Sequence, residues 1–157
     1  MKISKIKIQN FRSIRDAEIN CCDFNTFVGQ NNSGKTNLFE AIEFFYNGLG
    51  KGISVSDISF GRDTENEVVV ELTFTGALDG VEKMKNEKNA SAMKTALGEN
   101  DVISIRRSSK EVGKRKITIN EIELSKPPTG FDAALNDFLP KFEYIHTRQF
   151  YDALVKY

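Results

Sequence analysis

The sequence predicts an α/β fold in which a strand–loop–helix unit adjoins a mostly antiparallel sheet. Two observations lead to this prediction. The apolar run at 24–28 passes through a loop of small and polar residues into an amphipathic helical pattern that begins near Lys35. Strand-like segments with alternating apolar and polar residues lie on both sides of this unit. The length of 157 residues suits one domain or a piece of a larger one.

Composition places the chain among ordinary globular proteins, since 39% of residues are hydrophobic and 28% are charged. The 22 Lys and Arg residues balance the 22 Asp and Glu residues, so the formal net charge is zero. That balance excludes a strongly basic protein held to nucleic acid by its overall charge, and it leaves room for a local basic patch.

We expect a cytoplasmic protein without a membrane partner. No stretch approaches the 18 or more apolar residues of a membrane span, and the first residues alternate Lys with Ile instead of forming the apolar core of a signal peptide. The only cysteines, Cys21 and Cys22, are adjacent, which is too close for a comfortable disulfide. With His146 as the single histidine, they are expected to be structural and not zinc ligands.

The first third of the chain supplies the strand–loop–helix unit. Residues 2–9 alternate Ile with Lys and predict a strand, which a turn at 10–13 joins to a short strand at 17–20. The apolar run at 24–28 predicts a buried strand. One helix face then carries apolar residues at i, i+3, i+4 and i+7, namely Leu38, Ala41, Ile42 and Phe45.

The helix is expected to end at Asn47 and Gly48, because both tolerate the left-handed conformation of a helix end. Residues 47–64 predict a loop, and 67–75 give the strongest strand signal. Helical spacing is weak over 80–97. Segments 101–107 and 114–124 predict two strands of a hairpin.

The last third begins with a break at 127–130, where two prolines and a glycine interrupt any pattern. A short amphipathic helix is predicted over 131–139 and is ended by Pro140. Residues 142–147 predict a final strand, and 152–157 begin a further helical pattern.

Residues 29–36 match the phosphate-binding pattern G-x-x-x-x-G-K-[ST] at every fixed position. Gly34 lets backbone N–H groups approach phosphate oxygens, and the following helix N-terminus favours negative charge. Lys35 is expected to reach the β- and γ-phosphates and Thr36 to ligate Mg²⁺. The alternative is a glycine-rich turn that binds nothing. The strand before the loop and the helix after it favour the phosphate site.

Two motifs together resemble a known family. Ile8 to Arg12 matches I-x-N-F-R, and Gly29 to Asn37 matches G-x-N-x-x-G-K-T-N. This pairing resembles the N-terminal lobe of ABC-type ATPase heads of the RecF/SMC-like group, and within it the OLD family of ATP-dependent nucleases, found in bacterial antiviral systems. The resemblance is specific over 1–46 and rests on strand pattern alone from 66 onward.

The resemblance implies roles for individual residues. It implies that Arg12 lies near the nucleotide phosphates and that Gln149 lies near Mg²⁺ and the attacking water. A solvated turn residue and an ordinary polar loop residue are the respective alternatives, and Asn37 has the alternative of serving helix solubility. The expected catalytic residues are Lys35 and Gln149, with Thr36 on the metal. The expected ATP-binding residues are Arg12, Gly29, Asn31, Asn32, Ser33, Gly34, Lys35, Thr36 and Asn37.

Several parts of such an ATPase have no match in the sequence. There is no apolar strand ending in Asp-Glu and no Leu-Ser-Gly-Gly-like signature. We therefore expect 1–157 to be the first lobe of a head whose second lobe lies elsewhere, and a second head to be its dimeric or higher-order partner. The acidic residues Asp57, Asp63, Glu65 and Glu67 are interpreted as a solvated loop in preference to a nuclease metal site.

The basic residues gather on the predicted hairpin, at Arg106, Arg107, Lys110, Lys114, Arg115 and Lys116. They either face DNA phosphates or form a solvated surface. His146 is interpreted as a strand residue in preference to a catalyst.

The sequence thus favours the ATP-binding part of an OLD- or RecF-like ATPase that couples ATP to DNA binding or cleavage in antiviral defence or repair, with a defence subunit as a further partner. Hydrolysis is expected only when a second lobe and a dimer partner complete the site. The alternatives are a non-hydrolysing nucleotide-binding scaffold subunit and a small phosphotransferase.

Overall fold

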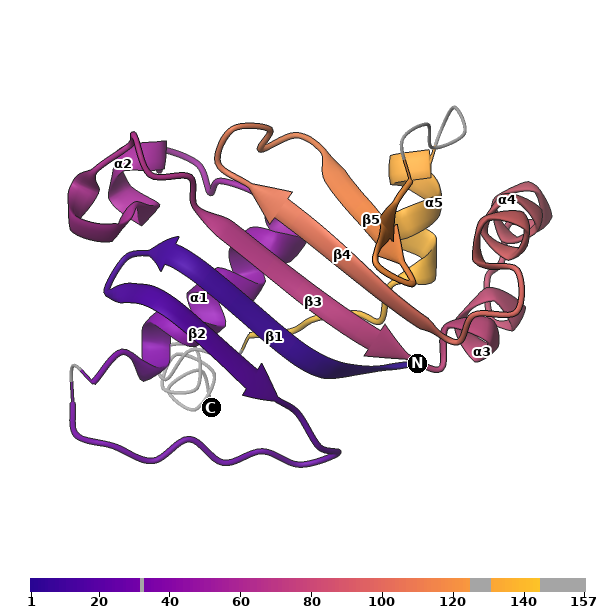
Figure 1. The fold of residues 1–157 in the computed structure, drawn as a ribbon, viewed down its shortest axis with the longest axis horizontal. Helices are drawn as coiled ribbons and strands as arrows, with labels where there is room; N and C mark the ends of the chain where they lie inside the picture. Colours follow the sequence, from indigo (N-terminus) through magenta and orange to yellow (C-terminus); the bar gives the residue numbers. More distant parts are fainter. Residues whose placement is uncertain (32, 125–130, 145–157) are drawn as a thin grey trace, which may run out of the picture.

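A six-stranded antiparallel sheet covered on one face by helices forms the body of the molecule (Figure 1). The structure is a computed structural model that describes residues 1–31, 33–124 and 131–144, with the backbone alone for 131–133. The strand order is β2-β1-β3-β4-β5-β6. The strands are β1 (Lys2–Phe11), β2 (Ile14–Asn20), β3 (Val69–Thr75), β4 (Val102–Ser108), β5 (Arg115–Ile119) and β6 (Ile122–Glu123).

Helices lie in the connections from β2 to β3 and from β3 to β4, and one more follows β6. They are α1 (Lys35–Asn47), α2 (Val55–Ile58), the 3₁₀ turn η1 (Phe60–Arg62), α3 (Ala77–Glu82), α4 (Glu87–Leu97) and α5 (Phe131–Phe138). Helices α1 and α5 lie behind the sheet as it is seen in Figure 1. Within the described residues, no helix is long and apolar enough to cross a membrane.

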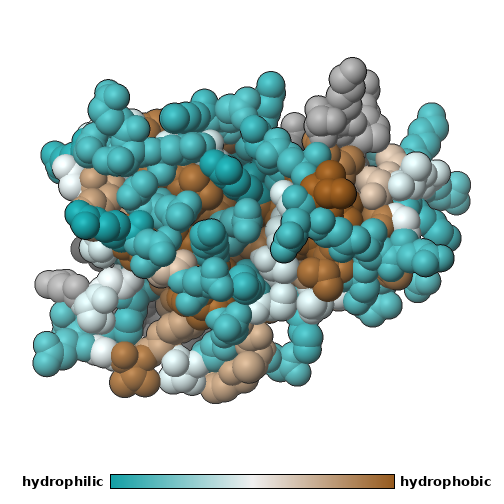
Figure 2. Space-filling view, viewed as in Figure 1, coloured by the Kyte–Doolittle hydropathy of each residue, from teal (hydrophilic) through white to brown (hydrophobic). Residues whose placement is uncertain are grey.

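The register of the sheet separates an apolar face from a polar one. Ile6, Leu72, Ile105 and Ile117 are aligned across β1, β3, β4 and β5. The next row along the same strands is Lys7, Glu71, Arg106 and Lys116. Because successive residues of a strand point to opposite faces, the first row is covered and the second is open to water. Figure 2 shows that open face as mostly hydrophilic.

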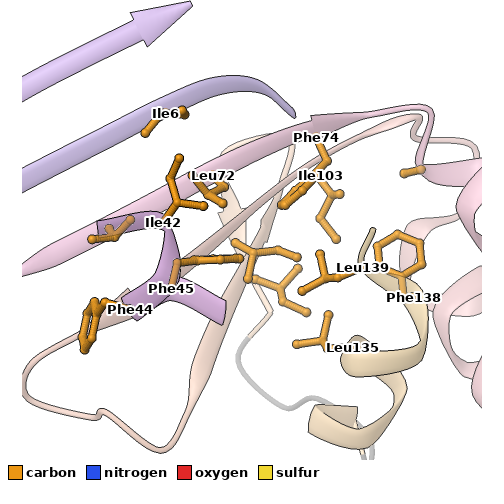
Figure 3. Packing of buried hydrophobic residues seen from close by; sticks show 14 of the residues in the cluster. Ile6, Ile42, Phe44, Phe45, Leu72, Phe74, Ile103, Leu135, Phe138 and Leu139 are labelled. Carbon is orange, nitrogen blue, oxygen red and sulfur yellow. The ribbon is translucent and has the colours of Figure 1, made fainter. Parts of the chain in front are cut away.

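Helix α1 is held against the apolar face by the side chains that the sequence pattern singles out. Its buried residues are Leu38, Ala41, Ile42, Phe44 and Phe45. Phe45 is fully buried and its ring centroid lies 6.2 Å from that of Phe74 on β3. Leu135, Phe138 and Leu139 extend the same core beneath β3 and β4 (Figure 3). The predicted helices near Lys35 and over 131–139 are therefore confirmed.

The predicted buried strand at 24–28 is wrong for this structure. The segment belongs to no strand, and Phe24 and Val28 are 85% and 90% exposed. Only Phe27 packs toward α1, in a T-shaped contact with Phe39. An apolar run becomes a buried strand only when neighbouring strands accept its backbone hydrogen bonds, and no described strand pairs with it.

Other differences follow from local turn and cap chemistry. The predicted loop at 47–64 contains α2, which begins with a capping box between Ser54 and Asp57. The weak helical pattern over 80–97 is two helices, α3 and α4, and the Asn86 side chain caps the second. The predicted strand over 114–124 is divided into β5 and β6 at residues 120 and 121, both with positive φ. The short strand predicted at 17–20 begins earlier in the structure, where it is β2 (Ile14–Asn20).

The predicted strand at 142–147 is absent over 142–144, where the chain forms no strand. Residues 145–147 and the helical pattern at 152–157 lie outside the described residues.

The two phenylalanines Phe45 and Phe24 give a direct test of this core. We expect Phe45→Ala to lower the free energy of unfolding by about 3–5 kcal/mol, because it removes a buried ring between α1 and β3. Phe24→Ala is the matched control, with an expected change within about 0.5 kcal/mol, since that ring is already in water. Denaturant unfolding of both variants measures the difference, and equal losses would contradict the packing described.

Candidate functional site

The loop before α1 is closed by its own lysine. Lys35 Nζ donates hydrogen bonds to the Gly29 carbonyl at 2.6 Å, the Gln30 carbonyl at 2.7 Å and Ser33 Oγ at 3.2 Å. These three acceptors match the three N–H bonds of an ammonium group. A bound phosphate would therefore compete with the loop's own oxygens for Lys35.

Helix α1 begins with an uncapped N-terminus directed at this loop. Its N-cap is Gly34, with φ of 92° and no side-chain cap, and its first turn carries no acidic residue. The left-handed φ is one that glycine adopts without strain. The first N–H groups of α1 thus lack the capping partner that most helices supply, which suits an anion.

A cavity of about 560 Å³ lies at this helix end, and it is called the loop cavity below. Its lining residues are Ser13, Asn31, Ser33, Gly34, Lys35, Thr36 and Asn37. A neighbouring cavity of about 530 Å³ shares part of that wall and continues along β2 past Ile14, Ala17 and Ile19. The described binding residues expected within 31–37 therefore line the loop cavity, whereas Gly29 lines the neighbouring one.

Thr36 fits the expected Mg²⁺ ligand. Its side chain is exposed in the first turn of α1 and lines the loop cavity. A hydroxyl oxygen there, together with phosphate oxygens, is the kind of ligand set that Mg²⁺ takes in nucleotide sites. No group of three or more His, Cys, Asp or Glu residues in the described part of the chain forms a separate metal site.

Arg12 lies apart from the loop cavity. Its guanidinium forms an ion pair with Glu40 on α1, and its backbone N–H donates to the Ile58 carbonyl at 2.7 Å. Both side chains line a different cavity of about 250 Å³, with Glu43 and Phe44 among its walls. The side chain of Arg12 is only a third exposed and is ion-paired, which does not fit the alternative of a solvated turn residue. Its place near the nucleotide phosphates stays a prediction.

Ser13, which the sequence analysis did not single out, lines the loop cavity, whereas its neighbour Arg12 does not. Asn37 Nδ2 donates to Ser13 Oγ at 2.6 Å, so Asn37 is tied to the turn and does more than keep the helix soluble. The signal for Ser13 was its position directly after Arg12 in a turn that precedes an edge strand. Chain order alone gave no indication that this turn lies over the helix end.

The remaining candidates from the sequence are two expected site residues, Asn32 and Gln149, and the residues interpreted as structural. Asn32, His146 and Gln149 lie outside the described residues. The acidic residues do not converge: Asp57 accepts from Ser54, Asp63 accepts from Asn66, and Glu67 pairs with Arg106. The two hydrogen bonds from Ser54 lower the pKa of Asp57, as suits a helix cap.

The basic residues of the β4–β5 hairpin divide between the two faces of the sheet. Arg107 and Arg115 are buried on the helix side, where Arg107 donates to the Val112 carbonyl and Arg115 to Asn136 Oδ1. The others surround a cavity of about 420 Å³ on the open face, called the hairpin cavity below. Its lining residues are Glu67, Arg106, Ser108, Lys110, Glu111, Lys114 and Lys116.

The charge balance of the hairpin cavity is positive. Burial acts to raise the pKa of Glu67, yet the Ser108 hydrogen bond and the charges of Arg106 and Lys110 lower it overall. Lys116 is held by Glu111 and Glu123, whereas Lys110 and Lys114 form no ion pair among the described residues.

The fold and loop define a P-loop nucleotide-binding protein with the architecture of an ABC-type ATPase head. A solved chain from work on ATP-driven dimerization and DNA-stimulated activation of SMC ATPases superposes with a TM-score of 0.60 at 18% identity, covering 97% of this chain and 90% of that one. The Smc head of Pyrococcus yayanosii gives 0.52 at 22% identity, over 86% of this chain and 24% of that one. At such identities the likeness establishes the fold.

Sequence comparison establishes the family. Residues 1–146 match the AAA ATPase domain model, and the chain belongs to this family. It is 29% identical to the Old nuclease of Escherichia phage P2 over 98% of this chain, and 36% identical to the DNA replication and repair protein RecF of Glaesserella parasuis over 63% of it. The chain spans 26% of the length of each of these two relatives. The resemblance to the RecF/SMC-like and OLD families is confirmed.

The left-handed helix start provides a test of the loop geometry. We expect Gly34→Ala to weaken ATP binding by about tenfold or more, because a residue with a β-carbon is strained at φ of 92° and would shift the amides at the start of α1. Gly52→Ala is the matched control, since Gly52 also has positive φ but nothing within 4 Å of an added β-carbon. Isothermal titration with ATP compares the two, and equal affinities would contradict the assignment.

Proposed function

We propose that the chain binds ATP with Mg²⁺ through residues 29–37 and serves as the ATP-binding part of an ATPase that couples nucleotide binding and hydrolysis to DNA binding or cleavage. One observation above all supports this: a complete phosphate-loop sequence stands at an uncapped helix N-terminus beside a cavity of about 560 Å³. In this proposal the loop amides and Lys35 hold the phosphates and Thr36 ligates the ion. ATP supplies the phosphoryl group that hydrolysis transfers to water.

We further propose that a second lobe completes this head. Phe24 and Val28 leave an apolar segment in water beside the loop. Phe39 of α1 already packs against a segment from the end of the described chain, because its ring stacks on that of Tyr144 with ring centroids 5.6 Å apart. A sheet from a second lobe would supply the backbone partners that 24–28 lacks, and it would bring the acidic residues that hydrolysis needs. Gln149 remains a proposed contact to the attacking water.

A non-hydrolysing scaffold is the second candidate. It is favoured by the absence of carboxylates from the walls of the loop cavity among the described residues. Since the proposed ATPase needs a second lobe and a second head, ATP hydrolysis is measured with both supplied and with DNA present. Turnover that Lys35→Ala removes supports the ATPase, whereas ATP binding without turnover in that completed assembly supports the scaffold.

The hairpin cavity is the proposed DNA contact of this function. Lys110 and Lys114 line it and form no ion pair with any residue that the structure describes, and Arg106 lines it while paired with Glu67. Phosphate groups favour such unpaired cations because each contact releases counterions. The relationship to the DNA replication and repair protein RecF supports a role in DNA repair. Antiviral defence is the proposed alternative role, with a second head and a defence subunit as proposed partners.

ATP binding is tested at the lysine of the loop. We expect Lys35→Ala to weaken ATP binding by about a hundredfold or more, because a charged contact to the phosphates is lost in a partly desolvated site. Lys51→Ala, in the exposed loop after α1, is the control and should bind as wild type. Isothermal titration reports both affinities. Undiminished ATP binding by Lys35→Ala would overturn the proposed function.

DNA binding is tested by reversing charge at the hairpin. We expect the double variant Lys110→Glu, Lys114→Glu to lose about tenfold or more in DNA affinity and to reduce the salt dependence by about two phosphate contacts. Lys83→Glu with Lys85→Glu is the matched control, because those exposed lysines lie between α3 and α4, away from the hairpin. Fluorescence anisotropy over a salt series measures both, and equal slopes would exclude this surface.

A further inference from the structure

We propose that Glu67 limits DNA binding at the hairpin cavity by holding Arg106, and that a DNA phosphate binds there by taking this arginine from it. The inference rests on the proposed DNA contact at the hairpin cavity. It goes beyond that contact because it identifies an acidic residue that sets how tightly the surface binds, and the arginine whose contact with DNA this acid restricts.

The hairpin cavity contains acids as well as cations. Four of its lining side chains are basic and two are acidic, Glu67 and Glu111. Each acid forms an ion pair within the cavity, Glu67 with Arg106 at 3.0 Å and Glu111 with Lys116 at 3.5 Å. The two side chains of the Glu67 pair are 28% and 36% exposed, against 46% and 48% for the Glu111 pair. Water and salt therefore screen the Glu67 pair less, and Glu67 is the stronger competitor with an incoming phosphate.

The side chain of Arg106 extends toward the cavity and pairs there with Glu67. Glu71 is the acid directly opposite Arg106 in the register of β3 and β4, and it forms no ion pair among the described residues. The guanidinium pairs instead with Glu67, which precedes Glu71 by four residues and lines the cavity together with Arg106. The Glu67 carbonyl accepts a hydrogen bond from Asn10 Nδ2 at 3.0 Å, which fixes the backbone that carries this acid. The arginine is therefore held at the place where a phosphate is proposed to bind.

The ion pair leaves one N–H group of Arg106 without an acceptor. Glu67 Oε1 accepts from Arg106 Nη2, whereas Arg106 Nε is buried and has no hydrogen-bond partner in the part of the chain that the structure describes. Nε and Nη2 lie on the same edge of a guanidinium, and two oxygens of one phosphate can accept from both at once. Because a buried N–H without an acceptor costs free energy, an oxyanion that accepts from the whole edge has an advantage over the single bond to Glu67.

The exchange of partners also has an electrostatic cost. Burial acts to raise the pKa of Glu67, but a serine hydrogen bond and two neighbouring cations lower it overall, so the carboxylate is ionised at neutral pH. A DNA phosphate that takes Arg106 must separate it from Glu67 and then lie close to this carboxylate. Two negative groups in one partly enclosed cavity repel each other. Glu67 therefore cancels much of the affinity that Arg106 contributes.

The test is a double-mutant cycle on DNA binding by the full chain, measured by fluorescence anisotropy with a labelled DNA duplex. We expect Glu67→Gln to strengthen binding about tenfold and to steepen the salt dependence by about one phosphate contact, because the amide removes the competing charge and releases Arg106. Glu71→Gln is the matched control, with an expected gain of at most about twofold, since it removes the same charge opposite Arg106 without breaking an ion pair in the described structure. In the Arg106→Gln background, the gain from Glu67→Gln falls to about twofold.

A gain in affinity is a result that damage to the fold does not produce. If Glu67→Gln gains no more than Glu71→Gln, overall charge explains the effect and the inference is overturned. A gain of the same size with and without Arg106 overturns the exchange of partners. The double variant Lys110→Glu, Lys114→Glu distinguishes these failures from failure of the proposed function. If it binds DNA as the wild type does, the hairpin cavity is not the DNA contact, whereas a loss in that variant without a gain in Glu67→Gln overturns this inference alone.

Discussion

The packing of α1 on the sheet is the constraint on which the candidate site depends. Buried side chains along one face of α1 set its position against β1 and β3, and Phe45 lies at the centre of that contact. Since the phosphate loop is the N-terminal continuation of this helix, burial far from the loop determines where its amides point. The β1–β2 turn meets the same helix end from the other direction. The site is therefore assembled where two rigid elements converge, and neither element could place it alone.

The two faces of the sheet carry different groups of residues and serve different parts of the molecule. The covered face holds α1 and directs the nucleotide loop, while the open face carries alternating charges and the hairpin cavity. One basic run in the sequence serves both faces. Arg107 supports the end of α1 from within, whereas its neighbour Arg106 faces water on the other side. Period-two alternation alone separates a structural arginine from one available to a partner.

The sequence predicted what local chemistry determines. The helix near Lys35 followed from its apolar spacing, and the loop followed from its fixed glycines and lysine, so both could be identified without coordinates. Contacts between distant segments were beyond such reasoning. Nothing in the spacing of Arg12 and Glu40 reveals that they pair, and nothing local shows that Ser13 meets Asn37. The strand predicted at 24–28 failed for a related reason: its apolar pattern is genuine, but a strand also requires a partner for its backbone, which a single segment cannot specify.

The unpaired segment at 24–28 gives the phosphate loop unequal flanks. On one side α1 is fixed by its helix hydrogen bonds and a buried face, whereas on the other side no strand that the structure describes pairs with the chain. When such a loop binds a ligand, residues 24–28 must become ordered, whereas α1 is already in place. Part of the interaction free energy is then spent on lost conformational entropy, so affinity would rise when a neighbouring strand pre-orders that flank. Sheet completion and nucleotide retention would in this way be thermodynamically linked.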